Sequence, residues 1–389
     1  MRARVRDARA AALACPRASR VGCACSRLPL GRVKRRHRTL LPPLGGQALS
    51  PKRTTRRWST LGDERLLDLR FADLDATVEG SVLEPLVHQV WGELEQRGIK
   101  LKPHAWASTE WFSPDGVPGI AVPFYLVHPR LLKLERAMMI EAEGSSREEC
   151  LMILRHEAGH AVQHAWRLQR RERWRRTFGD PSRPYPTLYR PNPASQRYVQ
   201  HLRQYYAQAH PHEDFAETFA VWLAPRSQWR RRYADWPVLK KLEYVDELMR
   251  ELRGTIPPVR SRRRVEPLSQ VKQTLREHYA AKQAHHASDR PTIPDRDLQR
   301  LFAAEPGRRG EPATAFLRRH RAELRRMVAR FTGESQFTLE HVIEDVSSRC
   351  RALELRAARA DRRLRVDFAL LLTVRTVHFH YSHRNWVAL

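Results

Sequence analysis

Apolar residues recur at helical spacing between residues 81 and 98, which predicts an amphipathic helix. Ser81 and Glu84 have the spacing of a capping box, in which each side chain accepts a hydrogen bond from the other residue's backbone amide. Gly98 suits the left-handed conformation in which many helices end. We therefore expect a helix that is capped by Ser81 and stops at Gly98.

The segment from 103 to 129 has a different pattern, rich in Trp, Val, Phe and Tyr and interrupted by Pro114-Asp115-Gly116 and Pro118-Gly119. Aromatic and β-branched residues between turn signals favour short strands joined by tight turns. A small sheet is therefore predicted here. Its residues 119–127 are a candidate edge strand for binding a peptide, and a strand buried in the core fits the same pattern.

A second helix is predicted from Ser145 or Ser146 to at least Trp166, because two overlapping Ser-x-x-Glu capping boxes precede an apolar run. Residues 167–176 continue it with many arginines, and a Pro-rich stretch through Pro193 then breaks the pattern. The arginine run could bind nucleic acid or acidic peptides, although such runs are more often a solvated helix face. The Pro-rich loop is of a kind that can wall a cleft.

Three more helices are predicted downstream, and the second of them has its large apolar side chains on one side. They span 196–208, 213–223 and 229–252. The apolar run 366–377 is either a buried helix or a strand, because its periodicity does not decide between them.

The clearest domain boundary follows Gly254, where Pro257-Pro258 and a basic stretch interrupt the helical pattern. The 389 residues, of which 41% are hydrophobic, are enough for two or three domains with buried cores. We divide the chain into a disordered basic tail, a central domain and a helical C-terminal region. These parts cover residues 1–58, 59–255 and 256–389.

The charge of the chain is strongly positive and unevenly distributed. Of the net charge of +28, residues 1–58 carry +15, because they hold 16 Lys and Arg and a single acidic residue, Asp7. The tail also has few large apolar residues, so we expect it to be disordered. Nucleic acid is a conceivable partner of this tail, but it is not the partner we favour.

The sequence predicts a soluble, cytoplasmic protein with no membrane partner. It contains no run of about 18 apolar residues and no apolar core of a secretion signal. Its five cysteines are an odd number and show no disulfide framework, which indicates reduced thiols.

The clearest chemical signal is His156-Glu157-Ala158-Gly159-His160, within the second predicted helix. Histidines four residues apart lie on one helix face, and this spacing is typical of zinc hydrolases. A catalytic zinc takes three protein ligands and leaves one position for water. We expect His156 and His160 to bind Zn²⁺ with a ligand from another element, because His164 lies about 12 Å along the helix from His156.

Glu213 is the preferred third ligand. Glu217 lies on the same face of the same predicted helix, where it can hold a ligand imidazole in the right tautomer. The small residues Ala158 and Gly159 leave room for another backbone to approach the metal helix. The competing candidates for the third ligand are His210, His212 and Asp214.

Glu157 is the predicted general base. It follows the first ligand directly, and from there it can take a proton from a zinc-bound water and hand it to the leaving amine. Zinc lowers the pKa of that water to about 7, so the transfer is feasible near neutral pH.

Four stretches of the chain resemble the putative zinc-binding metallopeptidase family of bacteria, within the gluzincin-like zincins. They are residues 111–125 (WFSPDGVPGIAVPFY), residues 153–160 (ILRHEAGH), and YAQ at 206–208 together with EDFAETFAVWL at 213–223. The resemblance covers about residues 60–255. It implies that His156, His160 and Glu213 are the metal ligands and that Glu157 is the catalytic base.

The resemblance also implies an α+β fold, with a zincin-like metallopeptidase core that is mostly helical and has a small sheet, followed by a helical C-terminal region. Related zincins place a tyrosine near the position of Tyr206, whose hydroxyl could stabilise an oxyanion, whereas packing in the core is the alternative role. The expected function is zinc-dependent hydrolysis of peptide or protein substrates. A catalytically silent zincin-fold binding module and a basic nucleic-acid-binding protein are the alternatives.

Overall fold

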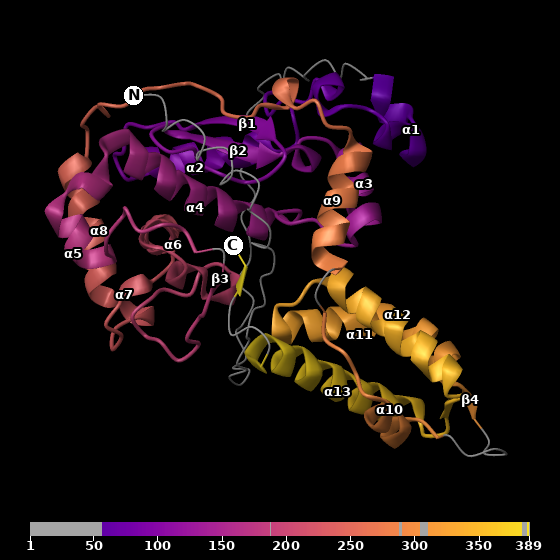
Figure 1. The fold of residues 1–389 in the computed structure, drawn as a ribbon. Helices are drawn as coiled ribbons and strands as arrows, with labels where there is room; N and C mark the ends of the chain where they lie inside the picture. Colours follow the sequence, from indigo (N-terminus) through magenta and orange to yellow (C-terminus); the bar gives the residue numbers. More distant parts are fainter. Residues whose placement is uncertain (1–56, 187, 288–289, 304–309, 383–386, 389) are drawn as a thin grey trace, which may run out of the picture.

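The computed structural model of the protein describes residues 57–186, 188–287, 290–303, 310–382 and 387–388 (Figure 1). These residues are mostly helical with small two-stranded sheets, as predicted. Their buried apolar side chains form two hydrophobic cores. The first core takes in residues between Trp58 and Tyr279 together with Phe337, and the second takes in residues between Leu298 and Leu372.

The first core begins with short helical turns and the amphipathic helix α2. These elements are η2 (Arg57–Thr60), α1 (Asp63–Leu67), η3 (Phe71–Leu74) and α2 (Glu84–Gln96). The predicted cap at Ser81 is wrong, because α2 begins later and Leu83 is its N-cap. Ser81 Oγ accepts from the Leu83 amide and Glu84 from the Gly80 amide, so both side chains stabilise the turn before the helix. Gly98 has φ +76°, as predicted for the helix end.

The small sheet consists of two parallel strands, β1 (His104–Ser108) and β2 (Gly119–Pro123), and every residue in them is buried. On its other side β2 pairs with Phe112, since the Ala121 amide donates to the Phe112 carbonyl at 2.8 Å. Residues 119–127 are therefore not a free edge strand at Ala121, because the loop between the strands folds back and occupies that edge. The segment then turns into η4 (Phe124–Leu126).

The long helix α4 (Arg147–Trp166) lies beneath this sheet (Figure 1). Of the two predicted caps, Ser146 is the N-cap, and its side chain accepts from the Glu149 amide at 3.2 Å. The helix ends at Arg167, which has a left-handed backbone with φ 52°. The neighbouring elements are α3 (Pro129–Met139), η5 (Leu168–Arg170) and α5 (Glu172–Phe178).

Helix α6 (Pro211–Leu223) confirms the helix predicted over 213–223 and packs against α4. The helix predicted over 196–208 is wrong: only η6 (Arg203–Gln208) is helical, and Gln204 and Tyr205 within it have left-handed backbones. The helix predicted over 229–252 is interrupted. It consists of α7 (Trp229–Arg232) and α8 (Leu239–Leu252), separated by a turn that contains Pro237, which has no amide hydrogen for a helix ladder.

After η7 (Leu268–Gln270), α9 (Leu275–Ala287) leads from the first core to a bundle of four helices (Figure 1). The bundle consists of α10 (Asp295–Leu301), α11 (Ala313–Thr332), α12 (Gln336–Ala352) and α13 (Asp361–Ser382). Residues 366–377 are thus helical. The short strands β4 (Glu311–Pro312) and β5 (Arg356–Ala357) pair with each other, as do β3 (Leu188–Tyr189) and β6 (Val387–Ala388).

The division into 59–255 and 256–389 stays a prediction, although α9 buries Leu275 and Tyr279 in the first core. The tail predicted to be disordered lies outside the described residues, except that Arg57 and Trp58 belong to η2. None of the helices in the described parts of the chain combines the length and apolar character that crossing a membrane requires.

Candidate metal centre

The site lies where α4 and α6 pack against each other. At Gly159 the two helices approach so closely that a β-carbon there would lie 2.9 Å from the Cα of Ala216 and 3.2 Å from its carbonyl oxygen. This contact is the close backbone approach that the small residues Ala158 and Gly159 predict. It brings the face of α4 that carries His156 and His160 against the first turn of α6.

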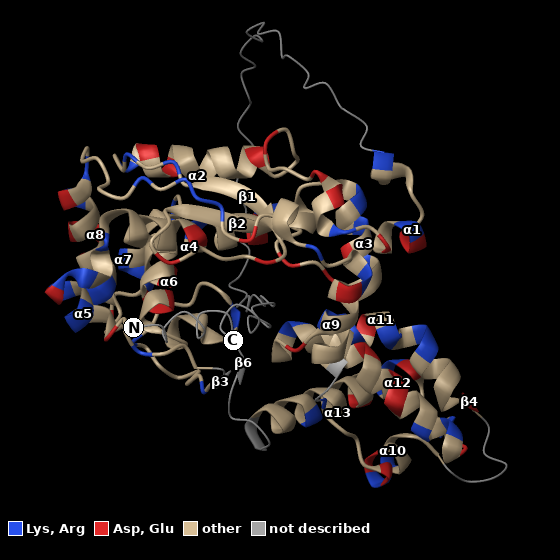
Figure 2. Cartoon of the chain, turned by 45° about the horizontal axis from the view of Figure 1, so that its top comes forward, with Lys and Arg blue, Asp and Glu red and all other residues tan. Residues whose placement is uncertain are grey.

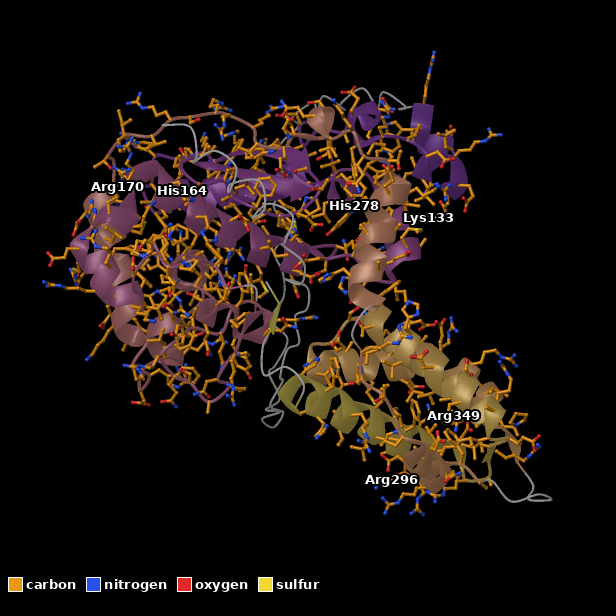
Figure 3. The ribbon with its side chains drawn as sticks, in the orientation of Figure 1. Lys133, His164, Arg170, His278, Arg296 and Arg349 are labelled. Carbon is orange, nitrogen blue, oxygen red and sulfur yellow. The ribbon has the colours of Figure 1, made fainter. Side chains whose placement is uncertain are left out.

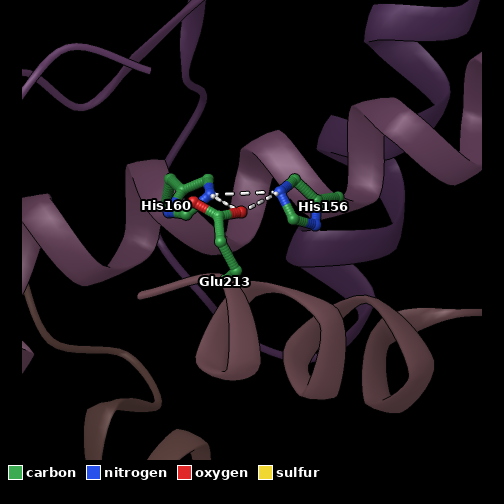
Figure 4. Close-up of side chains that lie close together, drawn as sticks. All are labelled: His156, His160 and Glu213. Atoms are coloured by element: carbon green, nitrogen blue, oxygen red, sulfur yellow. Dashed lines mark hydrogen bonds and ion pairs between the residues drawn. The ribbon is translucent and has the colours of Figure 1, made fainter. Parts of the chain in front are cut away.

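His156, His160 and Glu213 converge at this contact (Figure 4). Glu213 Oε2 lies 3.0 Å from His156 Nε2 and 3.2 Å from His160 Nε2, and the two ring nitrogens lie 3.1 Å apart. All three residues are buried. They form the one group of three metal-ligating side chains found within the described residues.

The arrangement fits a zinc ion. Donor atoms about 2.0–2.1 Å from a tetrahedral zinc lie about 3.3 Å from one another, and the three separations here are within a few tenths of an ångström of that value. Two imidazoles and one carboxylate are a ligand set that zinc takes at catalytic sites. Three protein donors would leave the fourth tetrahedral position for water.

Glu217 fixes the orientation of His156. Its Oε1 accepts from His156 Nδ1 at 2.8 Å, and its Oε2 accepts from the Leu202 amide at 2.8 Å. Because Nδ1 donates to Glu217, loss of the second ring proton, which metal binding requires, leaves the lone pair of Nε2 facing Glu213 and His160. Glu217 is fully buried. It lies on the same face of α6 as Glu213, as the four-residue spacing of the two glutamates predicts.

Charges in the site favour a bound cation. Burial alone would raise the pKa of Glu213, but His160 and the hydrogen bonds of His156 and His160 hold this pKa well below its ordinary value. Burial alone would lower the pKa of His156, but its hydrogen bonds with Glu213 and Glu217 raise this pKa well above its ordinary value. The carboxylate of Glu213 is thus ionised, as a metal ligand must be.

The other candidates for the third ligand are held elsewhere. His210 caps α6 by accepting from the His212 amide and contacts the Arg183 carbonyl at 2.7 Å, and His212 contacts Gln163 at 2.9 Å. Asp214 binds Lys241 at 2.6 Å. The structure therefore brings only Glu213, among these four neighbours, together with His156 and His160.

Glu157 is buried beside the first ligand, and its Oε2 has no hydrogen-bond partner among the residues that the structure describes. Its backbone carbonyl accepts from Ser113 Oγ at 3.2 Å, which ties the loop between β1 and β2 to the metal helix. A buried carboxylate oxygen without a partner is costly to keep in a folded protein, so such atoms are concentrated at functional sites.

Two tyrosines lie at the site. The ring of Tyr206 lies against that of His156, with centroids 5.7 Å apart. Tyr185 was not predicted, and its hydroxyl donates to Glu213 Oε1 at 2.9 Å while its ring stacks on His210 at 3.9 Å. Tyr185 lies in the Pro-rich loop that we expected to wall a cleft, but no local pattern marks this one residue.

Comparisons with known proteins agree with this geometry. Residues 142–230 match the model of the family described as "Putative zinc-binding metallo-peptidase". The match contains the whole of α4 and α6 and thus all three converging residues. No curated protein and no solved structure matches the chain.

Proposed function

We propose that this protein is a zinc-dependent peptidase of the gluzincin kind, with a zincin-like core formed by α4, α6 and the small sheet. The observation that carries the proposal is the convergence of His156, His160 and Glu213 at separations that suit one zinc ion. The family match over residues 142–230 supports it independently.

His156, His160 and Glu213 would hold the zinc. When bound, zinc polarises the substrate carbonyl and lowers the pKa of its water to about 7. Glu157 acts as the general base: it accepts a proton as the water attacks the peptide carbonyl, and it then delivers that proton to the amine as the C–N bond breaks. The Oε2 of Glu157 is suited to this exchange, because no group in the described parts of the chain forms a hydrogen bond with it.

Two further residues assist the reaction: one orients a zinc ligand and the other stabilises the oxyanion. Glu217 keeps His156 in the tautomer that presents Nε2, and the Tyr206 hydroxyl donates a hydrogen bond to the oxyanion of the tetrahedral intermediate. For Tyr206, this role rests on its position beside His156. Tyr206→Phe should lower kcat more than it raises KM, and an unchanged kcat would leave Tyr206 as a packing residue.

The deciding experiment compares the zinc-loaded protein with Glu157→Gln on a peptide library. We expect both proteins to bind zinc equally and the variant to lose at least about 100-fold in turnover, since general-base catalysis contributes about 10²–10⁴-fold. Equal turnover would remove Glu157 from the mechanism. Bound zinc without cleavage of any peptide by the unsubstituted protein would instead indicate a catalytically silent binding module.

A peptide or protein substrate is part of this proposal, and the cytoplasmic location stays a prediction. Binding of nucleic acid through residues 1–58 also stays a prediction, since nearly all of that segment lies outside the described residues.

A further inference from the structure

A small polar pocket lies next to the candidate metal centre. It has a volume of about 240 Å³, which suits one side chain rather than a whole ligand. It is lined by His164, Arg167, Gln169 and Arg170 from the end of α4 and the turn after it, and by Asp115 and Gly116 from the loop between β1 and β2. Val259, whose amide donates to the Ala165 carbonyl at 3.1 Å, lies on a further side.

The pocket and the metal site share α4, and the loop between β1 and β2 contacts both. His164 follows His160 by one helical turn, a rise of about 6 Å, whereas an extended peptide advances about 3.3 Å per residue. A substrate residue within about two positions of the cleaved bond therefore reaches the pocket. The loop that supplies Asp115 and Gly116 is also the loop whose Ser113 binds the backbone of Glu157.

Arg167 and Arg170 supply positive charge that no acidic residue in the described part of the chain neutralises through an ion pair. In the arginine-rich segment around α5, Arg171, Arg173 and Arg176 form ion pairs with Glu251, Glu247 and Glu172, respectively. Arg167 and Arg170, which line the pocket, form no ion pair within the described residues. Figure 2 shows the Lys and Arg residues gathered around α5, and Figure 3 shows His164 and Arg170 at the same end of the molecule.

The backbone of Arg167 adds a second observation. It is left-handed, with φ 52°, at a helix end where glycine is the usual residue. An arginine here costs stability of the order of 1 kcal/mol relative to glycine.

His164 provides a directed polar group. It is 3% exposed, its Nδ1 accepts from the Gly116 amide at 3.3 Å, and Asp115 Oδ1 lies 3.4 Å from the same Nδ1. In the neutral tautomer that accepts from Gly116, the proton of the ring is on Nε2. No hydrogen bond of Nε2 occurs within the described residues, so in this tautomer the Nε2–H can donate to a ligand in the pocket. An acceptor in the pocket would satisfy it.

We propose that this pocket binds a carboxylate of the peptide substrate, through Arg167, Arg170 and the Nε2–H of His164. The proposal rests on the peptidase function above and names its substrate class: peptides with an acidic group within about two residues of the cleaved bond. Asp115 is the one acidic residue of the lining, and the two arginines outnumber it. The carboxylate belongs either to an Asp or Glu side chain or to the C-terminus of the peptide.

The test uses paired fluorescent peptides in which Glu is exchanged for Gln at each of the two positions on either side of the cleavage site, each with a free or an amidated C-terminus. Binding to the zinc-loaded Glu157→Gln protein is measured by anisotropy, and cleavage is measured with the unsubstituted protein. At one position, we expect the Glu peptide to bind at least 10-fold more tightly than the Gln peptide and to be cleaved with a higher kcat/KM. Alternatively, the peptide with a free C-terminus should show the same advantage over the amidated peptide. The first result identifies a side-chain carboxylate and the second identifies a chain terminus.

In the Arg167→Gln/Arg170→Gln double variant, the ratio between acidic and neutral peptides should fall close to one. Arg167→Gly is a second variant that relieves the left-handed backbone, so it should raise Tm while it reduces the ratio. Arg171→Gln is the matched control, because Arg171 pairs with Glu251 outside the pocket, and it should keep the ratio. Asp115→Asn should increase the ratio between acidic and neutral peptides, because it removes the negative charge of the lining.

Equal binding of acidic and neutral peptides would overturn the pocket proposal, whether or not any peptide is cleaved. An unchanged ratio in the double variant would overturn it as well. Failure of the peptidase function has a different signature, since acidic peptides would then bind preferentially without being cleaved.

Discussion

Gly159 on α4 faces the backbone of Ala216 on α6 with no room for a β-carbon between them. This contact sets the distance between the helix that carries two of the candidate ligands and the helix that carries the third. The separation of the helices, and with it the metal site, therefore depends on the absence of a side chain at one position.

Gly159→Ala should push α6 away from α4. We expect the free energy of unfolding of the metal-free protein to fall by about 1–3 kcal/mol, as for other overpacked cores, and the zinc affinity to fall as well. Denaturant unfolding and chelator competition measure the two effects. Gly92→Ala is the control, because nothing lies within 4 Å of a β-carbon on that α2 residue, and it should stabilise the protein by about 0.5–1 kcal/mol. Equal effects of the two substitutions would contradict this account.

Glu213→Ala should mainly lower the zinc affinity, whereas Asp214→Ala should mainly lower the stability of the fold. Removal of Glu213 takes away a ligand, so zinc affinity should fall by at least about 100-fold. Burial raises the pKa of Asp214 to about 7 against the attraction of Lys241, and its removal leaves that lysine without its partner. We expect Asp214→Ala to cost about 3–5 kcal/mol of stability with little change in zinc affinity. Similar losses of zinc affinity in both variants would undo the ligand assignment.

Glu217→Gln should lower the zinc affinity by about 10–100-fold without removing a ligand, because the amide holds the Nδ1–H of His156 less well. Chelator competition at fixed pH gives the affinity, and circular dichroism checks the fold. Glu243→Gln, an exposed position on α8, is the control that should leave the affinity unchanged. If Glu217→Gln also left it unchanged, the orientation of His156 would not depend on Glu217.

His278 should make the protein sensitive to acid. Its ring lies edge-on to Phe71 and Phe124, and burial, helped by Lys282, lowers its pKa to about 3. Between the ordinary pKa of about 6.5 and about 3, the unfolded chain binds a proton that the folded protein does not, so stability falls as pH falls, by up to about 1.4 kcal/mol per pH unit.

His278→Phe removes this proton and should flatten the dependence of unfolding free energy on pH below 6.5. Denaturant titrations at several pH values between 6.5 and 4 measure the slope. The exposed His88, replaced by Gln, is the control. A slope that is the same with and without His278 would show that other groups account for the acid sensitivity.

Local chemistry determined much of the candidate site in advance. Histidines four residues apart share a helix face in any α-helix, so the pairing of His156 and His160 needed only the helix that the Ser146 cap and the apolar run predict. The same local argument applies to Glu213 and Glu217 on α6. The glycine at 159 likewise indicated that another backbone would pass there.

Local patterns failed where distant contacts compete with them. Residues 119–127 have the composition of an edge strand, but the return of Phe112 occupies that edge. Residues 196–208 have a helical pattern, yet Gln204 and Tyr205 adopt left-handed backbones next to the site, where Leu202 donates its amide to Glu217. In both segments, hydrogen bonds to residues outside the segment, Phe112 in the first and Glu217 in the second, decide the conformation.

Helix periodicity is a local property of the backbone, so the residue spacing was enough to place two imidazoles on one face of a helix, and a ligand carboxylate with its supporting carboxylate on one face of another. Three relationships follow from the packing alone: Glu213, rather than His210, His212 or Asp214, meets both rings, Tyr185 reaches Glu213, and two arginines without an ion pair among the described residues line a pocket one turn away. Those relationships depend on how helices and loops pack against one another, and the packing is fixed by contacts between residues that are far apart in the chain.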